Sequence, residues 1–545
     1  MRIWCWLLPL AAIGCNSSSA QHSPGGSGAG GGSDIGANVL PVALVTSTPD
    51  YVGLVTALDG SGSSDPAGRA LTYAWSVVST PSGSMVTGGG SNPTFTFVGD
   101  RGGDYTVALT VTTPSGATGM TTTTVTVPTL PVFYRQETFA AGGDSFVLGV
   151  VQSDGTGAHA VGCPVLIADK GDGGAGNKTY YGDNPEGVGT RVFYPATPMG
   201  NVEPLAVFAQ VSPASKQLLA TNASGDCTTA PPVRLDTTPT LDHWVPRFSP
   251  DGTRVAWIEG GQPASLVTAG VDGSARHVLR SAAPIEREPP VWLDGTTVAW
   301  VENASATDTP ELQLVSAPDI DNSDGSNDSL RAMLVDCPQA TDATSLGVIT
   351  QFDRVGTSWI VSGGVHSRFA NPAGAIELYR LAGNSCSTTA ATTLAAEPVG
   401  SFAWDFAPSP DGNTLALAAI ETDGTTSDIF LVPVDGSVQP SRFIGSAPGV
   451  DDLGPIWVAN GKQILWTQLA ANDVPGGGGL MIASRDGSNV RSLLAPSSVN
   501  GTSTFVGGAV NRGLDCSAGG SSASAAAELA LIAAACWLAR RRKWS

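Results

Sequence analysis

The chain is poor in positive charge and in histidine. Its 545 residues include 27 lysines and arginines, 47 aspartates and glutamates and only 5 histidines, which gives a formal net charge of −20. Because binding to a phosphate backbone needs clustered basic side chains, the composition excludes nucleic acid as a partner. The scattered histidines also argue against a histidine-based metal site.

The sequence also lacks the short motifs that carry common catalytic chemistry. It contains no Gly-x-Ser-x-Gly elbow, no His-Glu-x-x-His motif, no Cys-x-x-Cys pair and no Walker phosphate loop. These absences predict a chain with no catalytic residue and no cofactor, with calcium as the one candidate ion. One catalytic arrangement stays open, because many acidic residues permit carboxylate pairs whose proximity the sequence does not show.

Turn-forming residues are abundant, with 68 glycines, 38 prolines and only 14% charged residues. The stretch from residue 243 to 279 contains four short apolar runs separated by turns. In Ser249-Pro250-Asp251-Gly252, proline presets φ, the Asp side chain bonds nearby backbone and Gly adopts a positive φ. Asp272-Gly273 is a strong hairpin signal. Four antiparallel strands in roughly 40 residues are the unit of a β-propeller.

This unit recurs along the chain. Two later copies span residues 406–444 and 455–494, and weaker copies begin near residues 207, 290 and 347, which makes six. The Ser-Pro-Asp-Gly turn followed by an Asp-Gly turn resembles the TolB-type propeller repeat, over residues 132–510. Half-units at residues 146–161 and 504–510 pair with each other if the ring closes through its two ends, which removes free sheet edges. We therefore predict an all-β fold with six blades, or seven if the half-units pair.

Residues 39–127 predict a separate β-domain ahead of the propeller, joined to it by a short linker at residues 128–131. Alternate residues of one strand are apolar, as expected where one face is buried: Tyr105, Val107, Leu109 and Val111. Trp75 is expected to fill the core. The motifs LDGSGSSDP…LTYAW and GDYTVALTV together resemble a PKD-type immunoglobulin-like sandwich.

Two acidic segments contain oxygen ligands of the kind that hold calcium. Those of the sandwich either cap turns or bind calcium: Asp59, Ser61, Asp65 and Asp104. Those of the propeller form either a candidate calcium loop or an exposed hairpin loop: Asp319, Asp321, Ser323, Asp324 and Asp328. The propeller segment is not an EF-hand, because Asp324 stands where glycine is required.

Three tryptophans occupy equivalent second-strand positions in separate repeats: Trp257, Trp300 and Trp466. An exposed tryptophan can stack on a sugar ring, whereas a buried one packs between blades. We expect packing between blades.

The first fifteen residues, MRIWCWLLPLAAIGC, join one basic residue to an apolar run that ends in Cys15. This resembles a bacterial lipoprotein signal, which implies that Cys15 is the lipidated N-terminus of the mature chain. Ordinary signal cleavage after Ala20 is the alternative, and both imply export. Residues 16–38 are rich in Ser and Gly and predict a flexible tether.

The last segment, residues 516–545, has a cysteine, a Gly/Ser spacer, an apolar run at 525–539 and four terminal basic residues. As a helix the apolar run spans about 22 Å, short of a bilayer core of about 30 Å. The segment resembles the myxobacterial MYXO-CTERM sorting tail. That resemblance implies a short hydrophobic helix, modification at Cys516 and residence on the outer membrane or cell surface of a Gram-negative bacterium.

Four cysteines remain between the terminal segments: Cys163, Cys227, Cys337 and Cys386. An even number in an exported domain predicts disulfides, with three pairings open. The local pairing is Cys163–Cys227 with Cys337–Cys386.

The sequence favours an envelope-anchored, non-catalytic binding or scaffold protein, with the sandwich as a stalk and the propeller as the recognition platform. The expected partners are an envelope protein or a glycan, and the membrane through a lipid or the C-terminal helix. Two alternatives stay open. One is a surface hydrolase or lyase that acts on polysaccharide or peptide, and the other is a periplasmic partner of an envelope complex, like TolB.

Overall fold

The structure is a computed structural model of the chain. It describes residues 39–138, 145–160, 206–212, 215–221, 233–237, 241, 243–249, 251–260, 263–285, 290–303, 312–320, 327–337, 346–365, 377–381, 383, 391–395, 403–420, 427–444, 450–470, 479–494 and 502–506. The predicted signal, tether and sorting tail, with Cys15 and Cys516, lie outside these residues.

The N-terminal domain is a sandwich of two three-stranded sheets, with orders β1-β2-β4 and β3-β5-β6. Its strands are β1 (Thr46–Thr48), β2 (Val55–Asp59), β3 (Thr72–Ser79), β4 (Thr94–Val98), β5 (Gly103–Thr112) and β6 (Thr118–Val127). The predicted alternation along β5 is confirmed: Tyr105, Val107, Leu109 and Val111 are fully buried. They pack with Trp75 in the core between the sheets.

Seven sheets follow in the described part of the chain, all antiparallel. The first three are β10-β11-β12 (Ala206–Ser212, Ser215–Thr221, Val233–Arg234), β13-β14-β15-β16 (His243–Phe248, Arg254–Glu259, Ala264–Gly270, His277–Ala283) and β17-β18-β19-β20 (Val291–Trp292, Thr297–Asn303, Leu312–Pro318, Ala332–Cys337). The next two are β21-β22-β23-β24 (Leu346–Val355, Ser358–Val365, Glu377–Leu381, Ala391–Ala395) and β25-β26-β27-β28 (Ala403–Pro408, Thr414–Ile420, Ser427–Pro433, Ser441–Arg442).

The two remaining sheets lie side by side where the ring closes. The last blade is β29-β30-β31-β32 (Val450–Val458, Gln463–Ala470, Gly479–Ser484, Arg491–Leu494). The closing blade is β33-β7-β8-β9 (Thr502–Val506, Pro131–Thr138, Ser145–Gln152, His159–Ala160). The C-terminal β33 pairs antiparallel with β7, the first strand after the sandwich. The two half-units of the sequence therefore contribute to one sheet. Together with the six repeats this gives seven sheets in the described part of the chain, the number predicted if the half-units pair.

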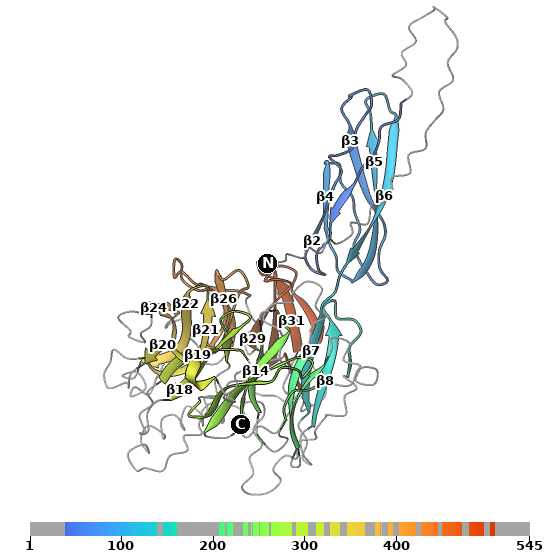
Figure 1. Ribbon diagram of the computed structural model, residues 1–545. Helices are drawn as coiled ribbons and strands as arrows, with labels where there is room; N and C mark the ends of the chain where they lie inside the picture. Colours follow the sequence, from blue (N-terminus) through green and yellow to red (C-terminus); the bar gives the residue numbers. More distant parts are fainter. Residues whose placement is uncertain are drawn as a thin grey trace, which may run out of the picture.

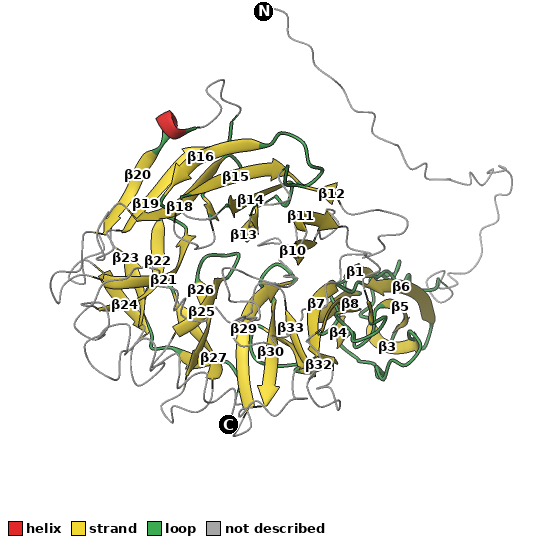
Figure 2. Ribbon diagram, turned by 90° about the horizontal axis from the view of Figure 1, so that it is seen from below, coloured by secondary structure: helices red, strands yellow, loops and turns green. Residues whose placement is uncertain are grey.

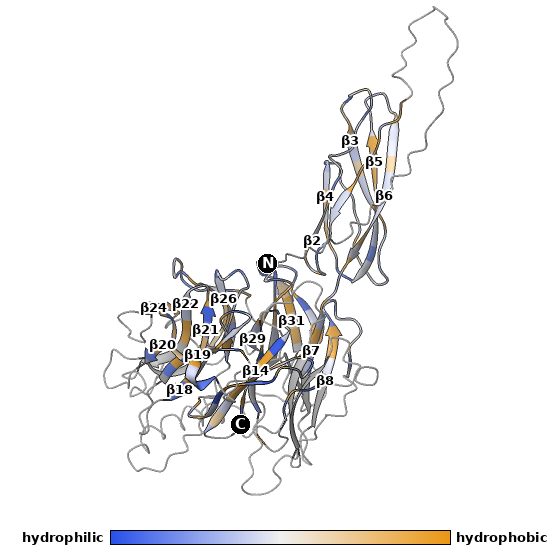
Figure 3. Ribbon diagram, in the orientation of Figure 1, coloured by the Kyte–Doolittle hydropathy of each residue, from blue (hydrophilic) through white to orange (hydrophobic). Residues whose placement is uncertain are grey.

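Sheets that follow one another in the chain are neighbours around a ring, as in a β-propeller, and the sandwich projects from this ring (Figures 1 and 2). Apolar clusters join neighbouring sheets rather than filling one sheet. One cluster contains Ile258 of β14, Trp300 of β18 and Val315 of β19, and another joins Leu480 of β31 to Val132 of β7. Apolar residues run along β5 in the sandwich and β8 in the ring (Figure 3).

The same turn geometry repeats around the ring. Just after the third strand of a sheet, a backbone N–H donates to the carbonyl of the residue just before the second strand. Five sheets make this bond: Ser153 to Leu130, Val271 to Thr253, Asp319 to Thr296, Val434 to Asn413 and Arg485 to Lys462. It brings the turn between strands one and two beside the turn between strands three and four. We call the side of the ring that carries both turns the turn face.

The described residues contain no α-helix, and η1 (Asp328–Leu330) is a short 3-10 turn. Within that part of the chain, no helix has the length and apolar character needed to cross a membrane. The predicted C-terminal helix lies outside it.

Candidate functional site

Aspartates cap most turns of the turn face. Each accepts a hydrogen bond from the backbone N–H two residues later, at 2.7–3.1 Å: Asp251 from Thr253, Asp272 from Ser274, Asp294 from Thr296, Asp411 from Asn413, Asp435 from Ser437 and Asp486 from Ser488. These bonds favour the ionised carboxylate and lower its pKa. Much of the acidic surface of the ring therefore serves its turns.

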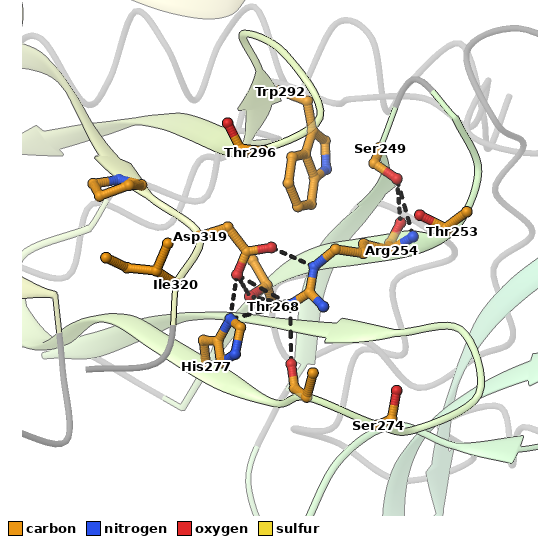
Figure 4. Close-up of polar contacts among 12 residues, drawn as sticks. Ser249, Thr253, Arg254, Thr268, Ser274, His277, Trp292, Thr296, Asp319 and Ile320 are labelled. Atoms are coloured by element: carbon orange, nitrogen blue, oxygen red, sulfur yellow. Dashed lines mark hydrogen bonds and ion pairs between the residues drawn. The ribbon is translucent and has the colours of Figure 1, made fainter. Parts of the chain in front are cut away.

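A densely hydrogen-bonded polar group on the turn face lies between the sheets β13–β16 and β17–β20 (Figure 4). We call it the Asp319 cluster: Arg254, Thr268, His277 and Asp319. Arg254 begins β14, Thr268 lies in β15, His277 begins β16, and Asp319 directly follows β19 of the next sheet. Equivalent turn geometry in the two sheets thus brings these side chains together.

Asp319 is the acceptor at the centre of the cluster, and its side chain is only 1% exposed. Its Oδ1 lies 2.6 Å from Thr268 Oγ1, 2.6 Å from His277 Nδ1 and 3.0 Å from Arg254 Nη2. Its Oδ2 contacts Arg254 Nε. A buried carboxylate is tolerated because a guanidinium compensates its charge and donors fill its lone pairs.

An Asp-His pair is also the orienting half of a catalytic triad, but the hydroxyl within this cluster, that of Thr268, does not contact the imidazole. A triad needs a hydroxyl that donates to the free imidazole nitrogen. In the Asp319 cluster the hydroxyl of Thr268 contacts the carboxylate and not the imidazole, and Arg254 Nη2 lies 3.3 Å from Nδ1, the same imidazole nitrogen that faces Asp319. The arrangement clamps two blades together.

A similar interblade contact occurs in the last blade, where a base and not an acid follows the third strand. Arg485 follows the third strand of the last blade, as Asp319 follows that of its own sheet. It reaches back to the preceding sheet, where its Nη1 lies 2.5 Å from Asp411 Oδ2 and its Nη2 lies 2.7 Å from Thr414 Oγ1. Thr414 begins its strand as Arg254 does. The position directly after the third strand therefore carries an acid in one blade and a base in another, and each pairs with the preceding blade.

The first strands of the sheets also contact one another. Trp292 of β17 donates from Nε1 to Arg247 O of β13 at 3.1 Å, and Trp457 of β29 donates to Ala407 O of β25 at 2.8 Å. Arg247 Nη2 lies 2.5 Å from Asp353 Oδ2 of β21, across the intervening sheet. This ion pair places opposite charges together on the first strands of two sheets, and we call the first strands of the sheets the inner strands.

The candidate calcium loop is described at its two ends only. Asp319 belongs to the Asp319 cluster, and Asp328 lies 3.3 Å from Arg280 Nη1 and accepts from Ser281. Asp321, Ser323 and Asp324 lie outside the described residues. Within those residues no group of three or more His, Cys, Asp or Glu side chains is arranged to hold a metal. The calcium loop stays a prediction.

The acidic residues of the sandwich have protein partners. Asp59 caps the N–H of Ser61 at 2.8 Å, which confirms the turn-capping interpretation. Asp65 binds Arg69 with both oxygens, at 2.7 and 2.9 Å, and this pairing lowers its pKa to about 2. Thr126 donates to Asp104 at 2.5 Å.

The three equivalent tryptophans, Trp257, Trp300 and Trp466, are 0–1% exposed. Packing between blades is therefore confirmed, and a sugar-stacking role is wrong because such stacking needs an exposed ring face. Of the four propeller cysteines, only the backbone of Cys337, at the end of β20, is described. Cys163, Cys227 and Cys386 lie outside the described residues, so both disulfides stay predictions.

Sequence reasoning missed the partners of Asp319. Arg254 and His277 lie 65 and 42 residues away from it, so no short motif contains them. One signal was present. Arg254 begins the second strand of one repeat, Asp319 follows the third strand of the next repeat, and the two residues carry opposite charges.

A family model for a PKD domain matches residues 53–127. No protein of the curated set matches the chain. Among solved structures, TolB from Acinetobacter baumannii is similar at 12% identity with a TM-score of 0.37, covering 80% of this chain and 82% of that one. Puromycin hydrolase is similar at 16% identity with a TM-score of 0.42, covering 67% and 53%. An oligogalacturonate lyase in complex with manganese is similar at 10% identity with a TM-score of 0.40, covering 67% and 85%.

These structural likenesses are too weak to transfer a function. The family match covers one domain, and it agrees with the sandwich observed over the same residues. The N-terminal domain of this chain is a PKD-like domain.

Proposed function

We propose that this chain is an envelope-anchored, non-catalytic binding or scaffold protein that uses the propeller as its recognition platform. The observation that carries the proposal is the ion pair of the inner strands, in which Arg247 neutralises Asp353. Glycoside hydrolysis by paired carboxylates needs one acid and one base that are both free to act. An inner-strand carboxylate held by a guanidinium suits recognition of polar ligand groups better than proton transfer.

The Asp319 cluster supports the same proposal on the turn face. Its imidazole and hydroxyl both contact the carboxylate of the next blade, which suits an interblade clamp. Propeller ligands generally meet loops and side chains around the ring centre, so one stable ring suits many ligands. We expect an envelope protein or an envelope glycan as the partner.

The anchoring part of the proposal rests on the terminal segments. A lipid at Cys15 and a modified Cys516 would hold the chain at the outer membrane or cell surface. Two attachment points bind a membrane far more firmly than one acyl chain. Mass spectrometry of the mature terminal peptides tests this part alone.

Binding is tested with the full chain, purified in mild detergent, on a glycan array and on fractionated envelope proteins. The matched variant is Arg247→Gln with Asp353→Asn, which keeps size and hydrogen bonding but removes both charges. We expect a saturable ligand whose affinity falls at least tenfold in the variant, with no turnover. Turnover of a polysaccharide or peptide panel that is lost in the same variant would contradict the proposal.

A further inference from the structure

The end of the sandwich nearest the ring is bonded to the last blade. Gln463 Nε2 and Arg491 Nη2 both donate to Val52 O, at 2.9 and 3.1 Å. Ser484 Oγ donates to Gly53 O at 3.1 Å. All three donor residues are the first or last residue of a strand, at the strand ends on the turn face.

The same end of the sandwich is bonded to the closing blade. Arg101 Nη1 donates to Asp154 O at 2.9 Å, and Gly102 N donates to Asp154 Oδ2 at 2.9 Å. Asp154 lies in the turn after β8. The sandwich therefore holds both blades that meet where the chain closes the ring.

An apolar cluster joins the same three parts. Leu54 of the sandwich, Leu130 at the entry to the closing blade and Ala459 of the last blade pack together, each at most 9% exposed. Burial of these apolar side chains removes them from water and stabilises the contact. The contact is thus a packed joint and not a flexible link through residues 128–130.

Comparing the closing seam with the Asp319 cluster, position by position, shows which contact the seam lacks. Gln463 begins the second strand as Arg254 does, and Arg491 follows its turn aspartate by five residues as His277 does. Ser153 directly follows the third strand, as Asp319 does. The closing seam therefore has a serine where the Asp319 cluster has its carboxylate.

The sandwich occupies the place of that missing acceptor. The carbonyl of Val52 takes the hydrogen bonds of Gln463 and Arg491. The other two nitrogens of Arg491, Nε and Nη1, are buried without a hydrogen-bond partner, and burial lowers the pKa of this guanidinium. Without the sandwich, Arg491 would lose its hydrogen-bonded acceptor.

We propose that the PKD-like sandwich is the clamp of the propeller's closing seam, in place of the ion pairs that join blades at two other seams of the turn face. The seam joins the last blade to a sheet built from both ends of the propeller segment. It is the place where a ring opens if its ends separate. Docking of the sandwich then controls how often β33 and β7 separate, independently of any ligand.

The test uses the full chain with Gly53→Val, which leaves every propeller residue unchanged. A side chain at Gly53 would overlap the Arg491 guanidinium. The matched control is Gly116→Val, because Gly116 has nearly the same φ (+84° against +83°) and nothing within 4 Å of the added carbon. Both variants have the same backbone strain, and only the first displaces the joint.

Hydrogen exchange followed by mass spectrometry measures how often the strands at the seam open. We expect amides of β7 and β33 to exchange at least tenfold faster in Gly53→Val than in Gly116→Val, with β14 and β15 unchanged in both. Equal exchange of β7 and β33 in the two variants and the parent would overturn the proposal.

If Gly53→Val does not fold, Ser484→Ala tests the same seam from the propeller side. It removes one hydrogen bond to the sandwich and should leave the fold intact. A rise of about threefold in exchange confined to β7, β33 and the last blade supports the clamp. Exchange identical to the parent in these strands would overturn it.

Discussion

At the scale of single residues, the contacts of Asp319 explain how an acidic ring accommodates a buried carboxylate. Its carboxylate is buried, yet it meets a guanidinium, an imidazole and a hydroxyl at hydrogen-bond distance. The sequence placed Asp319 in a candidate calcium loop or an exposed hairpin loop, and did not predict its role between two blades. Its partners lie in another repeat, and only the fold brings them within reach.

We predict that Asp319→Ala destabilises the propeller by about 3 kcal/mol, because it leaves Arg254 partly buried without its counter-charge. Urea denaturation measures the change. Asp272→Ala is the control, since it removes an exposed turn cap that accepts hydrogen bonds from Ser274, and we expect a loss near 1 kcal/mol. Equal losses in the two variants would show that Asp319 is merely another turn cap.

At the scale of elements, the turns were the most predictable feature of the chain. Gly252 and Gly273 adopt positive φ, at 70° and 79°, and Asp251 and Asp272 cap the turns, as turn chemistry predicts. Short strands at the ends of the sheets were less predictable. β12, β17 and β28 have only two residues, so they carry no alternation that a pattern can detect.

The capped turns predict a stability that depends on pH. Burial alone would raise the pKa of Asp411, but hydrogen bonds from Ser409 and Arg485 outweigh burial and lower it to about 2. The free aspartate has a pKa of about 3.9, so the stabilisation is complete above about pH 4 and is lost as the pH falls through about 2.

We expect the urea midpoint of the parent to fall between pH 4 and pH 2. Asp411→Asn keeps a side-chain acceptor for Asn413 but lacks the charge that attracts Arg485. Its midpoint should be lower than that of the parent at pH 7, and the gap should narrow towards pH 2. A gap that stays constant over this range would contradict the assignment.

At the scale of the whole molecule, the repeats and half-units predicted a ring closed by its two ends. β33 pairs with β7 as expected, and the resulting sheet raises the number of sheets to seven. The docking of the sandwich was not predictable. It depends on backbone carbonyls of Val52 and Gly53, and a sequence does not mark which carbonyls accept bonds from a distant blade.

Cross-linking of the closing strands tests the central claim, a ring closed by both ends of the propeller segment, most directly. Gln136 and Thr504 are partners in the β7–β33 register. We predict that Gln136→Cys with Thr504→Cys forms a disulfide, seen as a peptide that joins the two ends under non-reducing conditions.

The control pair is Val147→Cys with Thr504→Cys. Val147 is the partner of Gln136 on the other side of β7, so this pair is separated by two strand spacings, about 9.5 Å, beyond the reach of a disulfide. The account predicts cross-linking of the first pair and not of the second. Failure of the first pair, or equal cross-linking of both, would contradict closure of the ring by β33 and β7.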